Sequence, residues 1–269
     1  MSKPVSPTAR WNAADYAANS AVQQTWAREL IAQLHLRGDE HILDVGCGDG
    51  KVTVEIARAV PRGSIAGVDA SPQMIEFAQK TFPAKKNPNL EFHVMDARHI
   101  RFAQKLDLVF SNATLHWVDD HRAFLRGAAS VLRPGGRLVV SCGGKGNAHD
   151  VFVALCSKMR LKRWRGFFRR LEKPYFFYSP ADYEKWLPRF GFKSCGVKLS
   201  PKDAVYDGRD GFAAWLRTTW LPYTQRVPEN LREEFIAAVT DRYLGKHPPD
   251  AESRIHVRMV RLEIAAVKK

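Results

Sequence analysis

The sequence has few cysteines, no long hydrophobic run and fewer acidic than basic residues. Its four cysteines, at positions 47, 142, 156 and 195, form no Cys-x-x-Cys pair. This scatter argues against a zinc site or disulfide framework and favours reduced thiols, so we predict no metal and a cytoplasmic protein. No run of about eighteen apolar residues occurs, which predicts no membrane span. Because residues 1–12 lack an apolar segment, we also expect no secretory signal.

Lysine and arginine number 42 against 28 acidic residues, for a formal net charge of +14. Such a chain attracts nucleic acids, acidic carrier proteins and polyanionic small molecules alike. The 269 residues, 45% of them hydrophobic, are enough for one elaborated globular domain with a large core. Charge and size therefore indicate an anionic partner without specifying its class.

Strand-like and helical patterns alternate through the first half, which is typical of βαβ units and a parallel sheet. The predicted strands are 41–45, 64–68, 90–95, 106–111 and 137–141, and the predicted helices are 51–60, 72–82 and 120–132. Ser71 is the expected N-cap of the second helix, with Pro72 at its first position. The sequence therefore predicts a doubly wound α/β fold.

The regular alternation of strand-like and helical patterns ends after Gly143. We predict helices over 150–171, 181–187, 209–219 and 229–243, with strands near 194–199 and over 255–267. The apolar residues Leu161, Trp164, Phe168 and Leu171 recur at helical spacing, which supports the first of these helices. Because no repeat or linker interrupts the chain, we predict a single domain over 1–269 with inserted helices.

A glycine-rich turn, DVGCGDG at residues 44–50, follows the first predicted strand. Glycines permit a tight turn and let the backbone approach a ligand at the carboxyl edge of the sheet. The second strand ends at Asp69, which can accept hydrogen bonds from a ribose diol. The third ends at Asp96, near an expected adenine amino group, and the fourth at Asn112. A turn that binds nothing, with both aspartates as local caps, is the alternative.

Two nucleotide-binding motifs are incomplete in this turn. A dinucleotide fingerprint needs a third glycine at the sixth position of the motif, counted from Gly46 as the first, where Lys51 stands. A phosphate-binding loop needs Ser or Thr after Gly50-Lys51, where Val52 stands. A cofactor with ribose and adenine but no phosphate therefore fits better than a dinucleotide.

The segments ILDVGCGDG, GVDAS, VMDA, LDLVFSNATLHWV and LRPGGRLVV, in this order, resemble the class I S-adenosylmethionine-dependent methyltransferases. The resemblance implies a mostly parallel seven-stranded sheet with a reversed last strand, which suits residues 255–267. It also implies S-adenosyl-L-methionine as the cofactor. The residues that would bind it are Tyr16, Asp44, Gly46, Cys47, Gly48, Asp69, Ala70, Met74, Asp96, Ala97, Asn112 and Ala113.

A narrower resemblance, to trans-aconitate 2-methyltransferase and its relatives, is carried by WNAADYAANS, FSNATLHWVDDH and FAAWLRTTWLPY. It implies methylation of a carboxylate and a lid that carries Trp11, Tyr16 and Ser20. The implied regions are a lid (1–36), a cofactor half (37–143), a substrate half (144–254) and a last strand (255–269). His116 departs from the usual glutamine, and the usual GLRP late in the chain reads Trp220-Leu221-Pro222.

A carboxylate acceptor is already ionised near neutral pH, so it needs no general base but does need groups that hold its other carboxylates. His116 is the candidate catalytic residue, either to orient the acceptor or to act as a base. The candidate substrate-binding residues are Trp117, Arg217, Trp220 and Tyr223. The arginines at 160, 163, 165, 169 and 170 are further candidates, although the solvated face of a helix explains them equally well.

The acceptor is expected to be a small anionic acid, and four alternatives stay open. A malonyl group on an acidic carrier protein would dock on the basic segment 158–173, which holds eight Lys or Arg against one Glu. A nucleic-acid acceptor is disfavoured because SNAT at 111–114 lacks the Pro-Pro-aromatic run of enzymes that methylate base amines. A cofactor-binding regulator without catalysis and a nicotinamide-dependent oxidoreductase complete the alternatives.

Overall fold

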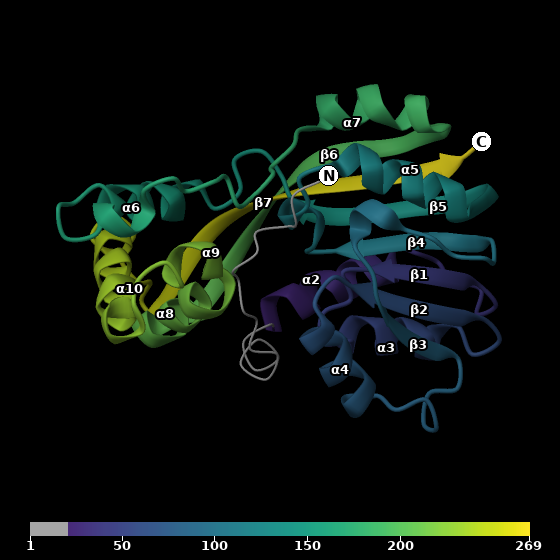
Figure 1. The fold of residues 1–269 in the computed structure, drawn as a ribbon, viewed down its shortest axis with the longest axis horizontal. Helices are drawn as coiled ribbons and strands as arrows, with labels where there is room; N and C mark the ends of the chain where they lie inside the picture. Colours follow the sequence, from purple (N-terminus) through teal and green to yellow (C-terminus); the bar gives the residue numbers. More distant parts are fainter. Residues whose placement is uncertain (1–20) are drawn as a thin grey trace. The chain divides into compact units, whose positions relative to one another are not determined.

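The computed structural model of the protein describes residues 21–269, and Figure 1 shows the fold. The predicted lid residues Trp11, Tyr16 and Ser20 lie outside the described residues. No helix within 21–269 combines the length and the hydrophobicity that crossing a bilayer requires.

The described chain forms a seven-stranded sheet in the order β3-β2-β1-β4-β5-β7-β6. The strands are β1 (His41–Val45), β2 (Ser64–Asp69), β3 (Leu90–Val94), β4 (Leu106–Asn112), β5 (Leu132–Gly143), β6 (Phe192–Asp207) and β7 (Arg254–Lys268). The pairs among β1 to β5 are parallel, and β7 runs antiparallel to β5. This confirms the predicted doubly wound, mostly parallel sheet with a reversed last strand.

The helices alternate with the strands as expected in the first half. They are α2 (Ala21–Ala32), α3 (Lys51–Ala59), α4 (Pro72–Thr81), α5 (His121–Val131), α6 (His149–Met159), α7 (Pro180–Trp186), α8 (Gly208–Thr219), α9 (Leu221–Thr224) and α10 (Glu229–Leu244). Ser71 caps α4, since its Oγ accepts a hydrogen bond from Met74 N, and Pro72 is the first helical residue. Asp120 caps α5 in the same way.

Helices cover both faces of the central strands because successive side chains of a strand point in opposite directions. Ile42 of β1 packs in one cluster with Ile56 of α3. Its neighbour Leu43 packs in another cluster with Phe124 of α5 and Tyr183 of α7. The central strands, buried on both sides, hold their carboxyl ends in a fixed row.

The described chain divides into two compact units. The first, which we call the sheet unit, contains residues 21–145, 175–200 and 261–269. The second, the helical unit, contains 146–174 and 201–260, so β6 and β7 begin or end in it. In the helical unit, Phe212 of α8 stacks on Tyr243 of α10, with ring centroids 4.8 Å apart. The predicted single domain over 1–269 stays a prediction.

The predicted continuous helix over 150–171 is wrong. Helix α6 ends at Met159, and turns with the short 3-10 helix η3 (Arg165–Phe168) follow. Trp164 and Phe168 both contact the ring of Phe235, each at 5.2 Å between centroids. Their helical spacing thus reflects a shared contact rather than a helix, and Gly166 further disfavours one. The basic residues at 160–170 therefore do not form one face of a helix.

Candidate active site

The glycine-rich turn adopts backbone conformations that favour glycine. Gly46, Gly48 and Gly50 have φ values of 78°, 54° and 80°, in the left-handed region. A Cβ on Gly46 would lie 2.0 Å from Cγ2 of Thr114, and the Thr114 hydroxyl donates to the Gly46 carbonyl at 3.0 Å. The turn is thus packed directly against the end of β4, which explains why glycine is needed there.

Asp44, in β1 and at the start of the glycine-rich segment 44–50, is a buried carboxylate only 2% exposed. Its Oδ2 accepts a hydrogen bond of 2.7 Å from the hydroxyl of Thr53 on α3. Burial raises the pKa of Asp44 to about 7, against the lowering effect of the Thr53 bond, and the nearby Asp69 adds to the rise. The described bonding partner of Asp44 is neutral, so the carboxylate is suited to a cationic ligand.

Asp69 lies at the end of β2 and joins the turn to α4. Its Oδ2 accepts from Gly48 N at 3.1 Å and its Oδ1 from Ser71 N at 2.9 Å. Burial raises its pKa, although the two backbone N–H groups act in the opposite direction. A carboxylate has room for about four hydrogen bonds, so two acceptor positions of Asp69 are compatible with a ribose diol.

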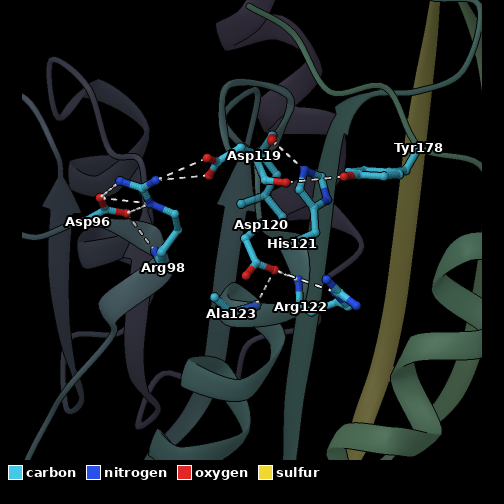
Figure 2. Close-up of polar contacts among 9 residues, drawn as sticks. Asp96, Arg98, Asp119, Asp120, His121, Arg122, Ala123 and Tyr178 are labelled. Atoms are coloured by element: carbon cyan, nitrogen blue, oxygen red, sulfur yellow. Dashed lines mark hydrogen bonds and ion pairs between the residues drawn. The ribbon is translucent and has the colours of Figure 1, made fainter. Parts of the chain in front are cut away.

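Asp96, two residues after the end of β3, accepts several hydrogen bonds from Arg98. Arg98 donates to the Asp96 carboxylate from its backbone N (2.8 Å), its Nε (3.1 Å to each oxygen) and its Nη2 (2.6 Å). Its Nη1 also reaches Asp119 at 3.1 Å, and Figure 2 shows this bridge between the two acids. Burial raises the pKa of Asp96, but the Arg98 bonds and charge outweigh it and lower the pKa overall. An adenine amino group would have to share this carboxylate with Arg98, and the predicted adenine contact stays a prediction.

The smaller predicted cofactor residues lie around these carboxylates in the sheet unit. Cys47, Met74 and Ala97 are buried, whereas Ala70 is exposed. Burial, together with the nearby carboxylates, raises the pKa of the Cys47 thiol well above its usual value, so Cys47 is an unreactive part of the turn. Ala113 has a left-handed φ of 57° and donates its N–H to Ser141 O at 2.7 Å.

Asn112, the last residue of β4, is bonded to an arginine that sequence reasoning missed. Arg261 of β7 donates from Nη2 to Asn112 Oδ1 at 2.9 Å and to Ser141 O at 2.6 Å, and from Nε to Ser141 Oγ at 3.1 Å. The guanidinium carbon of Arg261 also lies 5.6 Å from the ring centroid of Trp26 on α2. Arg261 is only 5% exposed, so the sheet unit contains a buried guanidinium beside the ends of β4 and β5.

His116 lies in the short 3-10 helix η2 (Leu115–Trp117) among aromatic rings. Its Nδ1 accepts a hydrogen bond of 3.3 Å from Gly143 N, and its ring centroid is 5.7 Å from Trp117 and 6.1 Å from Tyr175. Desolvation, with the charge of Arg261 next, lowers the pKa of His116 to about 3. The neutral ring therefore carries its proton on Nε2 and is a hydrogen-bond donor there.

A second histidine positions this 3-10 helix. His121 is buried, with Nδ1 2.6 Å from the Tyr183 hydroxyl and Nε2 2.7 Å from the Leu115 carbonyl. Because Nε2–H must donate to the carbonyl, Nδ1 accepts from Tyr183, and burial lowers the pKa of His121 to about 4. Figure 2 shows His121 with Tyr178, whose hydroxyl donates to the Asp119 carbonyl at 3.3 Å.

The predicted acceptor residues Arg217, Trp220 and Tyr223 belong to the helical unit. Arg217 of α8 forms a two-pronged ion pair with Glu233 of α10, at 2.7 Å from Nε and 2.6 Å from Nη2. Trp220 and Tyr223 are 3% and 6% exposed and pack around Phe152. Trp117, the fourth predicted acceptor residue, lies in the sheet unit. The roles predicted for all four stay predictions.

The arrangement in the sheet unit fits S-adenosylmethionine. Two carboxylates with neutral described partners, Asp44 and Asp69, flank a turn of left-handed glycines at the carboxyl edge of the sheet. Such carboxylates suit a ligand that carries ribose hydroxyls and cationic groups. Asp69 would hold the ribose and the turn the methionine portion, and the bound cofactor would supply an electrophilic methyl group on a sulfonium.

Comparisons with known proteins agree with this geometry. A family model described as a methyltransferase domain matches residues 42–136. The trans-aconitate 2-methyltransferase of Agrobacterium fabrum is 31% identical over 273 residues, covering 96% of this chain and 99% of the relative. That of Rhodopseudomonas palustris is 27% identical over 97% of this chain and 100% of the relative. The crystal structure of a putative methyltransferase from Bacillus halodurans shares the fold, with a TM-score of 0.63, 18% identity, and coverage of 91% of this chain and 99% of that one.

This chain belongs to the class I S-adenosylmethionine-dependent methyltransferases. Within that class it is similar to the trans-aconitate 2-methyltransferases over nearly its whole length. It is therefore an enzyme that uses S-adenosylmethionine, which removes the nicotinamide-dependent oxidoreductase and the non-catalytic regulator from the alternatives.

Proposed function

We propose that the enzyme methylates a carboxylate oxygen of a small polycarboxylic acid similar to trans-aconitate. The observation that carries this proposal is the 31% identity to a trans-aconitate 2-methyltransferase over 96% of the chain, which includes the helical unit as well as the cofactor turn. We further propose that residues 1–269 act as one catalytic domain in the cytoplasm, where the four free cysteines stay reduced.

The properties of His116 support a carboxylate acceptor. Methyl transfer is an in-line displacement in which the acceptor oxygen, the methyl carbon and the sulfur lie on one line, with reacting atoms about 3 Å apart. A carboxylate is ionised at neutral pH and loses no proton in this step. A histidine with a pKa of about 3 is a weak base, but its Nε2–H can donate to an anion. In this proposal His116 orients the acceptor and does not deprotonate it.

The alternative acceptor, a malonyl group on an acidic carrier protein, loses one of the observations that supported it. It assumed that residues 158–173 form a helix with a basic docking face, but α6 ends at Met159 and the chain beyond it forms turns and η3. One of the arginines in this segment, Arg163, is paired with Glu234 of α10. Malonyl carrier protein therefore serves as a test acceptor below and is not a second proposal.

The test is product analysis by mass spectrometry. The purified enzyme is incubated with methyl-labelled S-adenosylmethionine and, separately, trans-aconitate, citrate, a monocarboxylic acid and malonyl carrier protein. We expect trans-aconitate to be methylated at the highest rate and to give a monomethyl ester. Mild alkali should hydrolyse this ester and release its labelled methyl group as methanol. An alkali-stable N- or C-methyl product, or methylation of the carrier protein alone, would overturn the proposal.

A further inference from the structure

Arg98 is an almost buried arginine that lies between two carboxylates from separate segments of the sheet unit. It belongs to the short 3-10 helix η1 (Ala97–His99), and its side chain is only 6% exposed. Nη2 donates to Asp96 Oδ2 at 2.6 Å, and Nη1 donates to Asp119 Oδ1 at 3.1 Å and to its Oδ2 at 3.4 Å. Figure 2 shows the guanidinium between the two acids, and we call this arrangement the Arg98 bridge.

The Arg98 bridge joins two segments that the sheet alone does not connect. Asp96 follows β3, whereas Asp119 follows β4 and η2. Because β2 and β1 lie between β3 and β4 in the sheet, strand pairing does not join the segments that follow β3 and β4. Asp119 is 44% exposed, but its partner Arg98 is shielded from water, so solvent screens this ion pair less than a pair between two exposed side chains.

Asp96 holds Arg98 in one orientation. The Nε of Arg98 lies 3.1 Å from each oxygen of the Asp96 carboxylate, and its backbone N–H donates to Oδ1 at 2.8 Å. With these bonds in place, the Nη1 group faces Asp119 without further loss of side-chain freedom. Every contact of the bridge is one that Arg98 already makes, so the bridge requires no additional donor on this side chain.

Asp119 lies two residues after η2, in the segment that carries His116 and Trp117. The start of η2 is held by the neutral hydrogen bonds described above. After its end, the Asp119 carbonyl accepts from the Tyr178 hydroxyl at 3.3 Å, and the Asp119 carboxylate accepts from Arg98. The Arg98 bridge is the contact between charged groups that fixes this end of η2.

We propose that Arg98 is a positioning residue for methyl transfer, which acts through Asp119 on η2 and not by contact with the acceptor. An in-line displacement requires close alignment, and a misplacement of about 1 Å can lower the rate about 100-fold. By fixing the end of η2, the Arg98 bridge keeps His116 and Trp117 where they meet the acceptor. This last step rests on the proposed function, because the contact of His116 with the acceptor belongs to that proposal.

The kinetic test compares Asp119→Asn, Arg98→Gln and their double variant with wild type, with trans-aconitate as the acceptor and saturating S-adenosylmethionine. We expect Asp119→Asn to lower kcat/KM for the acid about three- to tenfold, and Asp119→Glu, which keeps a carboxylate, to recover part of the loss. Arg98→Gln should lower kcat/KM at least as much as Asp119→Asn. The double variant should be no worse than Arg98→Gln alone, because both changes weaken the same contact. Losses that multiply in the double variant would overturn the inference.

Cofactor affinity and stability separate positioning from a general structural role. Asp119 lies outside the residues predicted to bind the cofactor, so Asp119→Asn should bind S-adenosylhomocysteine within twofold of wild type by calorimetry. Its unfolding midpoint should also stay close to wild type, because Ile100, next to η1, and Phe124 of α5 pack in the same apolar cluster independently of the bridge. Equal losses of acceptor turnover, S-adenosylhomocysteine affinity and stability would mean that the bridge only supports the fold, which contradicts the proposal.

Glu76→Gln is the matched control. Glu76 forms an ion pair of 2.6 Å with Lys80 on α4, and both side chains are exposed. This substitution also changes a carboxylate into an amide and breaks an ion pair, but it does so on α4 rather than next to η2. We expect kcat/KM for trans-aconitate to be unchanged in this variant.

Hydrogen exchange tests the bridge without any acceptor. The amides of Trp117 and Val118 donate to the carbonyls of Thr114 and Leu115, so their exchange reports how firmly η2 is held. We expect peptides that cover residues 113–120 to exchange at least threefold faster in Asp119→Asn and Arg98→Gln than in wild type, and at the wild-type rate in Glu76→Gln. Wild-type exchange in both bridge variants would overturn the inference.

The two kinds of measurement keep the inference and the proposed function apart. If wild type methylates no carboxylic acid, the proposed function fails, while hydrogen exchange still decides whether Arg98 holds η2. The kinetic comparison is then made with the acceptor that the product analysis identifies. If wild type methylates trans-aconitate and Asp119→Asn does so with an unchanged kcat/KM, only the inference fails.

Discussion

The buried carboxylate of Asp44 makes the stability of the cofactor-free enzyme depend on pH. The pKa of Asp44 is about 7 in the folded protein and 3.8 in an unfolded chain. The folded state therefore binds the proton more tightly, so the free energy of unfolding falls as pH rises from about 4 to about 7 and then levels off. At about 1.36 kcal/mol per pKa unit, the raised pKa of Asp44 lowers the free energy of unfolding by about 4 kcal/mol at pH 8 and about 2 kcal/mol at pH 5, relative to its value well below pH 4. At pH 5 the carboxyl is protonated in the folded protein but ionised in the unfolded chain.

Asp44→Asn removes this ionisation and keeps an oxygen that can accept the Thr53 hydrogen bond. We expect the variant without cofactor to be more stable than wild type by about 4 kcal/mol at pH 8, which corresponds to a rise in Tm of about 8–16 °C. The gain should shrink to about 2 kcal/mol at pH 5. Urea unfolding of both proteins at several pH values between 4 and 9 measures the difference, in which the titration of other groups largely cancels.

Thr53→Val is the control for this reasoning. The Thr53 hydroxyl lowers the pKa of Asp44, so its removal should raise that pKa further and extend the loss of stability to higher pH, with a larger total loss. A stability difference between Asp44→Asn and wild type that does not vary with pH would show that Asp44 is not protonated by burial. A variant less stable than wild type at pH 8 would refute the reasoning outright.

Three further substitutions test the site. Asp69→Ala should weaken S-adenosylmethionine binding at least tenfold, about 1.4 kcal/mol, because two ribose hydroxyls lose their acceptor; unchanged affinity by calorimetry would remove Asp69 from the site. Arg217→Ala should raise the KM for the acceptor more than the KM for the cofactor. Glu233→Gln, which breaks the same ion pair but keeps the arginine, should leave the acceptor KM unchanged. Equal changes in the acceptor KM in both variants would indicate structural damage. Gly46→Ala should destabilise the fold by about 2–4 kcal/mol, because alanine disfavours a left-handed φ and its Cβ would clash with Thr114. Gly135→Ala is the control: its φ is 77° but the space around it is open, so it should show only the cost of the left-handed backbone. Similar unfolding midpoints for both variants would count against the packing described for the turn.

The fold of the first half could be predicted because its signals are local. The turn at 44–50, the cap at Ser71 and the alternation of strands and helices each depend on neighbouring residues, and the structure confirms these elements within a few residues. The prediction of a helix over 150–171 was wrong because Trp164 and Phe168, although at helical spacing, both contact the ring of Phe235 on α10. The conformation of that segment depends on contacts with residues that are distant in the sequence, and a periodic pattern does not encode such contacts.

The candidate site was predictable only where it follows a strand directly. Asp44 and Asp69 come together at the turn as expected from the strand ends, whereas Arg261 is 149 positions from its partner Asn112. A signal for Arg261 exists in the sequence, since β7 buries Ile255, Val257 and Met259 at alternate positions and an arginine occupies the next one. A charged residue at a position that alternation predicts to be buried is worth treating as a functional candidate.

A crystal structure of the enzyme with S-adenosylhomocysteine and trans-aconitate tests the central claim most directly. The ribose hydroxyls should lie within hydrogen-bonding distance of the Asp69 carboxylate, the homocysteine portion against Gly46, and the acid toward Asn112. A ligand bound away from the turn at 44–50, with Asp69 still bonded only to backbone N–H groups, would contradict the account.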